Sequence, residues 1–402
     1  MRFTFLHAAD LHIDSPLESL GAKDPAVAGR FARAGRAAVE ALVRETIESE
    51  AKFLIIAGDV FDGDWKDVST GLFFVRQLGE LFRAKIPVFL IKGNHDADSL
   101  MSRALRYPDN VHTFAARAET RSLEPLRVAL HGRSFAQRAA AYDFVKSYPA
   151  RREVWLNIGL LHTGLDGRPG HDPYAPCTVA DLRGFGYDYW ALGHIHAAEI
   201  VCRDPWVVYS GNIQGRSPRE TGPKGFTRVT VDDGRVVSVE PVAVDAARWA
   251  HETVDVSGAA DEAEALGLIA ETLERAYANA DGRPLAARIT LTGISPAHAR
   301  LIVHRESLEA DARAKGFEIG AECWVERLRV ATRAEPQRAF AAEPDGLDVE
   351  ALIAAAAEEP EFAATLAELK RAIVDKLPTA LREDFLADDI AALAREFHDG
   401  ER

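Results

Sequence analysis

The sequence predicts an α/β domain followed by a small α+β domain and a helical tail. Short apolar runs rich in β-formers alternate with amphipathic stretches through the first 245 residues. The pattern changes after the turn at residues 232–234, where a shorter series of strand and helix patterns begins. The last part of the chain is rich in Ala, Glu and Leu, which favour helices. We therefore divide the chain into residues 1–245, 246–334 and 335–402.

The first domain is predicted to alternate strands with helices. Six short apolar runs have the composition of buried strands: residues 3–8, 53–57, 87–91, 128–130, 156–161 and 189–192. Apolar residues recur at helical spacing over residues 27–50 and 68–84, so these two helices should cover the sheets. Residues 235–244 follow a turn and close the domain as a hairpin.

The second domain and the tail follow a different pattern. Residues 249–256, 259–280, 287–292, 296–315 and 317–332 indicate strand, helix, strand, helix and strand in turn. Residues 334–342 have the composition of a linker. Residues 347–397 predict three short amphipathic helices, because Pro360 and Pro378 interrupt an otherwise helical composition.

The composition is that of a soluble globular protein. Apolar residues make up 47% and charged residues 27% of the 402 residues, which excludes disordered and fibrous classes. No apolar run reaches the ~18 residues of a membrane helix, and Asp10 and two histidines interrupt the start where a signal peptide needs an apolar run. We expect a cytoplasmic protein with no membrane segment. Three cysteines without a CxxC spacing argue against a disulfide framework or a zinc-thiolate site.

The acidic residues are concentrated in the tail. The net charge is −14, but residues 335–402 hold 17 Asp and Glu against 7 Lys and Arg. The remaining 334 residues hold 45 acidic and 41 basic side chains. The body of the protein is therefore close to neutral, and the overall charge does not exclude DNA as a partner.

Polar motifs follow five of the predicted strands. They are Asp10-x-His12, Gly58-Asp59-Val60-Phe61-Asp62, Gly93-Asn94-His95-Asp96, His162, and Gly193-His194-Ile195-His196. Oxygen and imidazole ligands without thiolates suit divalent Mn, Fe or Zn. A carboxylate that bridges two ions can hold them ~3.5–4 Å apart, the arrangement for in-line attack on phosphate. One such pair alone is more often a surface turn, but five in this order predict a dinuclear phosphoesterase site. The other eight histidines, His7 and His131 among them, lack such a context.

With these motifs the sequence resembles the calcineurin-like metallophosphoesterases, and within them the SbcD-type DNA-repair exonucleases, closest to the YhaO branch. The segment Val208–Arg216, followed by Glu220-Thr221-Gly222 and Lys224-Gly225, supports the assignment to that branch. The resemblance implies a calcineurin-like metallophosphoesterase sandwich of two mixed sheets flanked by helices. It also implies that the α+β domain is a capping domain that binds DNA and that the helical C-terminal tail binds an ATPase.

The resemblance also implies the metal ligands. One ion is expected on Asp10, His12, Asp59 and His196, and the second on Asp59, Asn94, His162 and His194, with Asp59 bridging. Mn is the expected metal, and Fe or Zn are also compatible with these ligands.

Three further residues are expected to assist catalysis. His95 is the family's candidate for protonating the leaving 3′ oxygen, and Asp96 is expected to orient His95. Some relatives have a His where this chain has Asp62, so we interpret Asp62 as a residue that orients its neighbours and not as a metal ligand.

Contacts to DNA are predicted after the last motif. Five cations lie between residues 203 and 228, and phosphate contacts require such charges near the metals. A solvated face would have the same composition. The candidate DNA or phosphate contacts are Asn212, Gln214, Arg216 and Lys224.

Together, these observations predict a Mn-dependent DNA phosphodiesterase that acts in DNA repair. We expect an exonuclease, with endonuclease activity also open. The resemblance implies a homodimer and an SMC-like coiled-coil ATPase of the SbcC or YhaN type as partner. Two alternatives stay open: a hydrolase of cyclic nucleotides or other small phosphodiesters, and a non-catalytic subunit that binds DNA and the ATPase. The tail helices would equally fit an independent helical hairpin.

Overall fold

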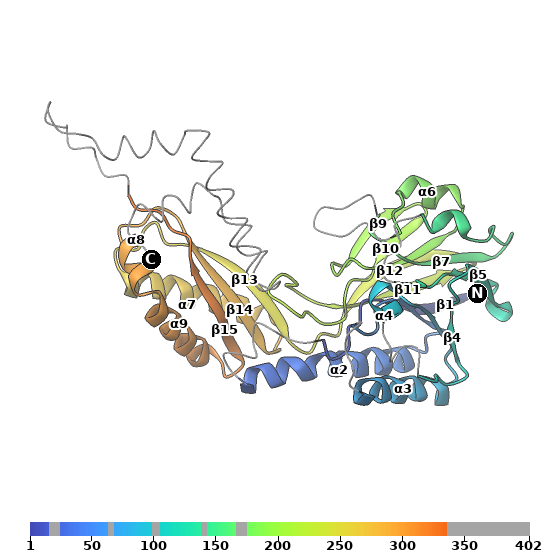
Figure 1. The fold of residues 1–402 in the computed structure, drawn as a ribbon, viewed down its shortest axis with the longest axis horizontal. Helices are drawn as coiled ribbons and strands as arrows, with labels where there is room; N and C mark the ends of the chain where they lie inside the picture. The colour runs from blue at the N-terminus through green and yellow to red at the C-terminus, as the bar shows by residue number, and fades with distance from the viewer. Residues whose placement is uncertain (16–24, 63–67, 99–104, 138–142, 166–174, 336–402) are drawn as a thin grey trace, which may run out of the picture.

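The computed structural model describes residues 1–15, 25–62, 68–98, 105–137, 143–165 and 175–335. They form two bodies, which the long helix α2 (Pro25–Glu48) and the chain around residue 245 connect (Figure 1). The predicted tail helices lie outside the described residues. Among the helices that the structure describes, none combines the length and apolar character needed to cross a membrane.

The first domain contains two mixed six-stranded sheets. The first sheet has the order β12-β11-β1-β2-β3-β4 and the second β5-β6-β7-β8-β10-β9. The strands of the first sheet are β1 (Arg2–Ala8), β2 (Leu54–Ala57), β3 (Val88–Ile91), β4 (Val111–Thr113), β11 (Gly225–Asp232) and β12 (Arg235–Ala243). Those of the second are β5 (Glu119–Leu123), β6 (Val128–Gly132), β7 (Leu156–His162), β8 (Tyr189–Gly193), β9 (Glu199–Arg203) and β10 (Trp206–Tyr209). Neighbours among β1 to β4 and among β6, β7 and β8 are parallel.

The sheets pack face to face, and helices cover their outer faces. Alternate residues of β1 show why: Phe5 packs between the sheets, whereas Leu6 packs toward α2 and α3 (Val68–Arg83). On the far side, α6 (Val179–Gly184) places Leu182 against Trp190 of β8. The short helical turn η2 (Val145–Ser147) belongs to the same layer through Val145, whereas η1 (Glu124–Leu126) connects β5 to β6. The predicted sandwich of two mixed sheets flanked by helices is confirmed.

The second domain is a three-stranded sheet with helices. Its strands β13 (Arg248–Asp255), β14 (Leu285–Thr292) and β15 (Cys323–Val330) run parallel. Crossover helices connect them: α7 (Glu262–Ala278), then α8 (His298–Val303) and α9 (Arg305–Ile319). Strands and helices thus alternate along this domain. The single helix predicted over residues 296–315 is two helices that meet at His304, and the last strand begins at Cys323, not at residue 317.

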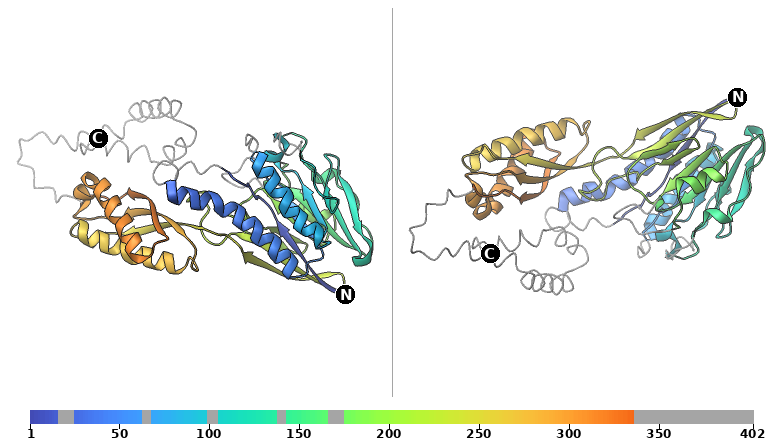
Figure 2. Two further views of the ribbon diagram at one scale, coloured as in Figure 1. Left: turned by 90° about the horizontal axis from the view of Figure 1, so that it is seen from below. Right: turned by 90° about the horizontal axis from the view of Figure 1, so that it is seen from above.

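Helix α2 belongs to the cores of both domains. Its C-terminal part packs on the first sheet through Val39 and Leu42. Its N-terminal part lies beside the second domain (Figure 2). Phe31 there belongs to one apolar cluster with Trp249 and Trp324 of the second domain. The ring centroids of Phe31 and Trp249 are 5.1 Å apart. One helix therefore fixes part of the contact between the domains.

Candidate metal centre

The predicted motifs meet at one edge of the two sheets. Each follows the carboxyl end of β1, β2, β3, β7 or β8, and the parallel strands of each sheet end on the same side. A short helix, α4 (Asn94–Asp98), begins within the third motif. The fold therefore brings loops that are up to 186 residues apart in the sequence into one site.

The backbone is strained where the motifs begin. Asp10, His12, Asp59 and His194 have positive φ angles of 51°, 40°, 53° and 97°. Non-glycine residues adopt this region at a cost, and such strain is concentrated at functional sites. Glycine permits the close packing: a Cβ on Gly93 would lie 2.1 Å from Asp59 Oδ1.

His12 and His196 turn their Nε2 atoms toward each other. His12 Nδ1 lies 2.7 Å from Asp62 Oδ1, and His196 Nδ1 lies 2.7 Å from Glu220 Oε1. Burial would raise the pKa of both carboxyl groups, but these contacts to His12 and His196, with help from Arg216, lower each pKa well below its usual range. An ionised carboxylate only accepts, so Nδ1 of each ring is the donor and Nε2 is the nitrogen left to face the other ring. The two Nε2 atoms are 3.2 Å apart, close enough to be ligands of the same ion.

The same argument applies to His162. Its Nδ1 donates to the carbonyl oxygen of Ala57 at 2.9 Å, so Nε2 is the nitrogen that faces the site. That Nε2 lies 3.0 Å from Asn94 Oδ1 and 3.2 Å from Asp59 Oδ2. Two oxygens and this nitrogen therefore converge in a buried place, where a divalent cation would contact all three.

The pKa values agree with a site built for positive charge. Burial would lower the pKa of His162, but the charge of Asp59 and a bond to it raise that pKa to about 9. Burial would likewise raise the pKa of Asp59, yet His162 and His12 lower it far below its usual range. In the absence of metal the site thus attracts a proton that a divalent ion would displace.

Two groups of ligand atoms are close enough to hold an ion. Asp10, His12 and His196 form one group, and Asp10, Asp59 and His162 form the other, with all atoms of a group within 4.8 Å of one another. Asp10 belongs to both groups, whereas the family resemblance implied only Asp59 as a bridge. The main-chain N–H of His194 donates to Asp10 at 3.0 and 3.1 Å, and the His194 ring lies 5.3 Å from that of His162. Asn94 lies beside His162, as described above. The structure thus brings together all seven predicted ligands.

His95 lies beside these groups with its side chain 32% exposed. Its ring centroid is 5.3 Å from that of His12, and its Nδ1 is 3.4 Å from Asp62 Oδ1. Asp62 therefore contacts His12 and His95 together. This is the geometry of an orienting carboxylate, and the exposed side of His95 is open to a substrate.

The carboxylate of Asp96 binds main-chain groups, whereas we predicted that it orients His95. Its carboxylate is buried and accepts main-chain N–H groups of Val60 at 3.0 Å, Phe61 at 3.0 Å and Gly93 at 3.2 Å. Burial and the charge of Asp59 raise its pKa to about 7. Asp96 therefore ties the loop after β2 to the loop after β3, and the carboxylate beside His95 is Asp62.

The four candidate DNA contacts divide into two pairs. Asn212 and Gln214 are buried, and their amides donate to Glu220 Oε2 at 2.8 Å and to the carbonyl oxygen of Ala247 at 2.6 Å. Such inward positions correct our assignment of these two residues to DNA. Arg216 lies 3.6 Å from Asp62 Oδ2, beside the metal ligands, and Lys224 Nζ donates to the His196 carbonyl oxygen at 3.3 Å.

Sequence reasoning missed one residue of the site, Glu220. It lies 24 positions after His196, and we interpreted it only as part of a subfamily signature. The signal available was a carboxylate within a segment rich in cations.

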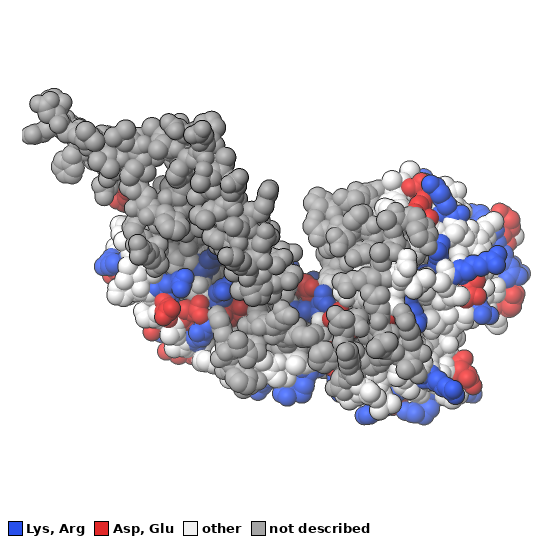
Figure 3. All heavy atoms as spheres, in the orientation of Figure 1, with Lys and Arg blue, Asp and Glu red and all other residues white. Residues whose placement is uncertain are grey.

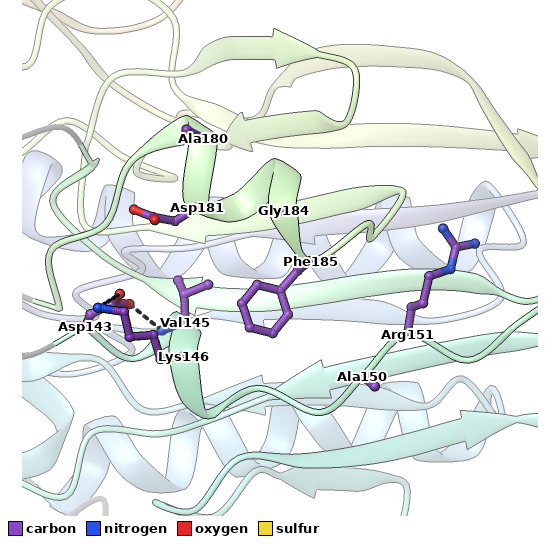
Figure 4. A pocket seen from close by; sticks show the side chains of 9 residues that line it. All are labelled: Asp143, Val145, Lys146, Ala150, Arg151, Ala180, Asp181, Gly184 and Phe185. Carbon is purple, nitrogen blue, oxygen red and sulfur yellow. Dashed lines mark hydrogen bonds and ion pairs between the residues drawn. The ribbon is translucent and has the colours of Figure 1, made fainter.

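His7 and His131 are core residues. His7 Nδ1 is 3.0 Å from the Tyr189 hydroxyl, and His131 contacts Thr120 and Asn157. A hollow of about 470 Å³ lies elsewhere, on the outer face of the second sheet between η2 and α6. Lys146 and Asp143 form an ion pair at its rim (Figure 4). None of the residues lining this hollow belongs to the motifs.

Two family models match separate parts of this chain. A family model for calcineurin-like phosphoesterases matches residues 3–198, and a model for the middle domain of the metallophosphoesterase YhaO matches residues 249–333. The chain is 34% identical over 298 residues to a protein described as uncharacterized metallophosphoesterase YhaO, from Bacillus subtilis strain 168. That match covers 73% of this chain and 72% of the relative.

Similar solved structures include TT1561 of Thermus thermophilus and a dimetal phosphatase from Danio rerio. Their identities to this chain are 13% and 12%, and both TM-scores are 0.36. The matches cover 61% and 60% of this chain, and 100% and 99% of the two structures.

Proposed function

Because the chain belongs to the calcineurin-like metallophosphoesterases of the YhaO type, we propose that its metal centre cleaves phosphodiester bonds at DNA ends. One observation carries the choice of DNA over a small ester. The loop over residues 212–222 contacts the metal ligand His196 and also the second domain. An extended substrate at the metal centre therefore lies beside a second domain that can hold its further nucleotides.

The ligands fit two divalent ions, for which we propose Mn. Asp10, His12 and His196 would hold one ion, and Asp59, Asn94, His162 and His194 the other. Asp10 belongs to both groups, and Asp59 Oδ2 lies 3.2 Å from His162 Nε2 and 3.9 Å from His12 Nε2. When bound, such a pair polarises the phosphoryl oxygen and activates water for in-line attack. The charged carboxylates and neutral imidazoles of this chain provide the coordination without thiolates.

His95 is the proposed proton donor to the leaving oxygen. Asp62 holds the ring through Nδ1 at 3.4 Å, and the side chain is partly open to solvent. A general acid must reach the leaving atom while its orientation stays fixed. Arg216 places its guanidinium 3.6 Å from the same Asp62 and is the proposed contact to the substrate phosphate.

The described surface in Figure 3 shows no broad basic patch on this face. On the described part of the face in Figure 3, basic and acidic side chains are interspersed. Binding is therefore proposed to depend on phosphate contacts beside the metals and to be independent of sequence.

The experiment compares cleavage of end-labelled linear duplex and circular single-stranded DNA, with a generic phosphodiester ester in parallel. Wild type with Mn should cleave DNA, and both EDTA and His95→Ala should abolish cleavage, while His95→Ala keeps two bound ions. Cleavage of the ester alone, even when the ATPase is added, would instead indicate a small-substrate phosphodiesterase. Arg2→Ala, an exposed residue at the amino end of β1 and thus away from the carboxyl ends that carry the site, is the control.

Two partners also belong to this proposal. We propose that an SMC-like ATPase binds the tail, residues 335–402, so removal of that segment should abolish capture of the ATPase and spare cleavage. Capture by the truncated chain would contradict this assignment.

A second copy of the chain is the other proposed partner. Val68, Leu72 and Phe82 lie on one face of α3 and are 66%, 57% and 49% exposed. An apolar stripe on a helix fits a homodimer contact. Sedimentation should show that Leu72→Lys shifts a dimer to a monomer, and a monomeric wild type would contradict the proposal.

A further inference from the structure

The strongest unassigned feature is the loop that links His196 to the second domain. Glu220 in this loop is a carboxylate surrounded by donors, with its side chain only 13% exposed. Its Oε1 accepts from His196 Nδ1 at 2.7 Å, and its Oε2 accepts from Asn212 Nδ2 at 2.8 Å and from the Arg216 main-chain N–H at 2.7 Å. Only a group that accepts on both oxygens satisfies this environment.

The loop also holds the backbone of His196. The His196 carbonyl oxygen accepts the main-chain N–H of Asn212 at 3.2 Å and Lys224 Nζ at 3.3 Å. Gly211, with a φ of 73°, allows this approach, because a Cβ there would lie 2.9 Å from the same oxygen. The ring and the backbone of His196 are thus held by one segment, residues 211–224.

The other side of this segment holds the second domain. Gln214 Oε1 accepts the Ala246 N–H at 2.8 Å, and its Nε2 donates to the Ala247 carbonyl oxygen at 2.6 Å. Trp249 Nε1 donates to the Gly215 carbonyl oxygen at 3.0 Å. Lys224, whose side chain holds His196, also accepts the N–H groups of Val244 and Asp245 through its own carbonyl oxygen, at 2.9 and 3.1 Å, and these are the last two residues before the second domain.

Trp249 makes this link rigid. It is 1% exposed and packs against Phe31 of α2 in the core between the domains. A shift of the second domain therefore has to move residues 214–215, and with them the partners of Glu220.

We propose that Glu220 is a positioning residue for the metal ligand His196, and that residues 211–224 couple its position to the seating of the second domain. This inference rests on the proposed metal centre. It specifies what holds the ligands on the side of that centre that contains His12 and His196. A carboxylate partner fixes the ring orientation of a ligating histidine and makes it a better ligand. Seating of the second domain, for example on an extended substrate, would therefore strengthen binding of one of the two ions.

The experiment titrates Co²⁺ and Mn²⁺ into the metal-free full-length chain. It records the affinity of each ion and the visible spectrum of bound Co²⁺, which reports ligand geometry. Glu220→Gln should weaken one ion by about 10- to 100-fold and leave the other unchanged. The amide is a poor substitute, because its NH₂ group would face donors. Glu153→Gln, whose side chain is 80% exposed, is the matched control and should bind as wild type.

The coupling is tested separately with Gln214→Ala and Trp249→Phe. Each should weaken the same ion in the same direction, by about 2- to 30-fold, and shift the same Co²⁺ band. Trp249→Phe keeps an aromatic ring in the core and removes the bond to Gly215, so it serves if Gln214→Ala does not fold. Thermal unfolding of the metal-free variants verifies that each is folded.

The outcomes distinguish the positioning role of Glu220 from the coupling to the second domain. Wild-type affinity and spectrum in Glu220→Gln would overturn the positioning role. A weakened ion in Glu220→Gln with no change in folded Gln214→Ala or Trp249→Phe would overturn the coupling. Two bound ions without DNA cleavage would overturn the proposed substrate and leave this inference standing, whereas a wild type that binds no ion would overturn both.

Discussion

The two sides of the metal centre are held by different parts of the molecule. His162 is fully buried, and its Nδ1 donates to the main-chain oxygen of Ala57 in the core strand β2. The His196 side chain is 22% exposed, and its Nδ1 donates to the side chain of Glu220 in a loop. A main-chain partner within a sheet cannot be removed by substitution, whereas a loop carboxylate can. The sheet therefore fixes one side of the site, and the side chains of loops fix the other.

Asp59 should give the largest effect, because its Oδ2 lies 3.2 Å from His162 Nε2 on one side and 3.9 Å from His12 Nε2 on the other. Asp59→Ala should lose both ions and lower phosphodiester hydrolysis by about 10³-fold, since several kcal/mol of charge stabilisation are lost with the ions. Metal content by mass spectrometry and ester hydrolysis measure this. The exposed Asp109→Ala is the control. Retention of one ion in Asp59→Ala would mean that the two sides are independent.

Substitution of Asp62 tests the His12 and His196 side of the metal centre, which loop side chains hold. Asp62→Ala removes the partner of His12 Nδ1, so the ion on this side should bind about 10- to 100-fold more weakly. Because Asp62 also contacts His95, saturating Mn should not restore the full rate. Metal titration and kcat at saturating Mn measure the two effects. Full recovery of kcat would show that Asp62 acts on the metal alone.

Substitution of Asp96 tests the loops after β2 and β3, which carry Asp59 and Asn94. Asp96→Asn replaces an acceptor with an NH₂ group that faces main-chain donors of Val60 or Gly93. We expect a loss of about 1–3 kcal/mol in the free energy of unfolding. Denaturant unfolding measures it, with Asp109→Asn as control. An unchanged unfolding midpoint would contradict the role of Asp96 as a tie between loops.

Substitution of His7, a residue of β1 that contacts Tyr189 of β8, should give the smallest effect. Burial lowers the pKa of His7 to about 3, below its value of 6.5 in the unfolded chain. The unfolded state therefore binds more protons between these values, and stability should fall as pH drops below about 6.5. Between pH 7 and 5 the loss is on the order of 1–2 kcal/mol. His7→Gln should show a flatter dependence of Tm on pH, and parallel curves would contradict this account.

The sequence predicted the layout of the site because its motifs are local. Each motif follows a strand of consecutive apolar residues, so the carboxyl ends of the sheets were recognisable. Strands β4, β5 and β9 were missed because their side chains are only partly buried and show no apolar run. The start of β15 was misplaced because Phe317 and Ile319, which favour strands, lie in the last turn of α9.

The errors at the site have a common physical cause. Asp96 follows His95 directly, and adjacent residues on a helix such as α4 point in different directions. The adjacency of Asp96 to His95 therefore suggested that Asp96 orients this ring. In the structure, Asp62 is the carboxylate beside it. Glu220 escaped notice because no local spacing relates it to His196, and only the folded loop brings the two together.

The most direct test of this account is a Mn²⁺ titration of the metal-free protein, monitored by electron paramagnetic resonance, for wild type, Asn94→Ala and His196→Ala. The account predicts two ions per chain in wild type, with Asn94→Ala weakening one ion and His196→Ala weakening the other. A single ion, or the same ion lost in both variants, would contradict a centre with two sides that are held separately.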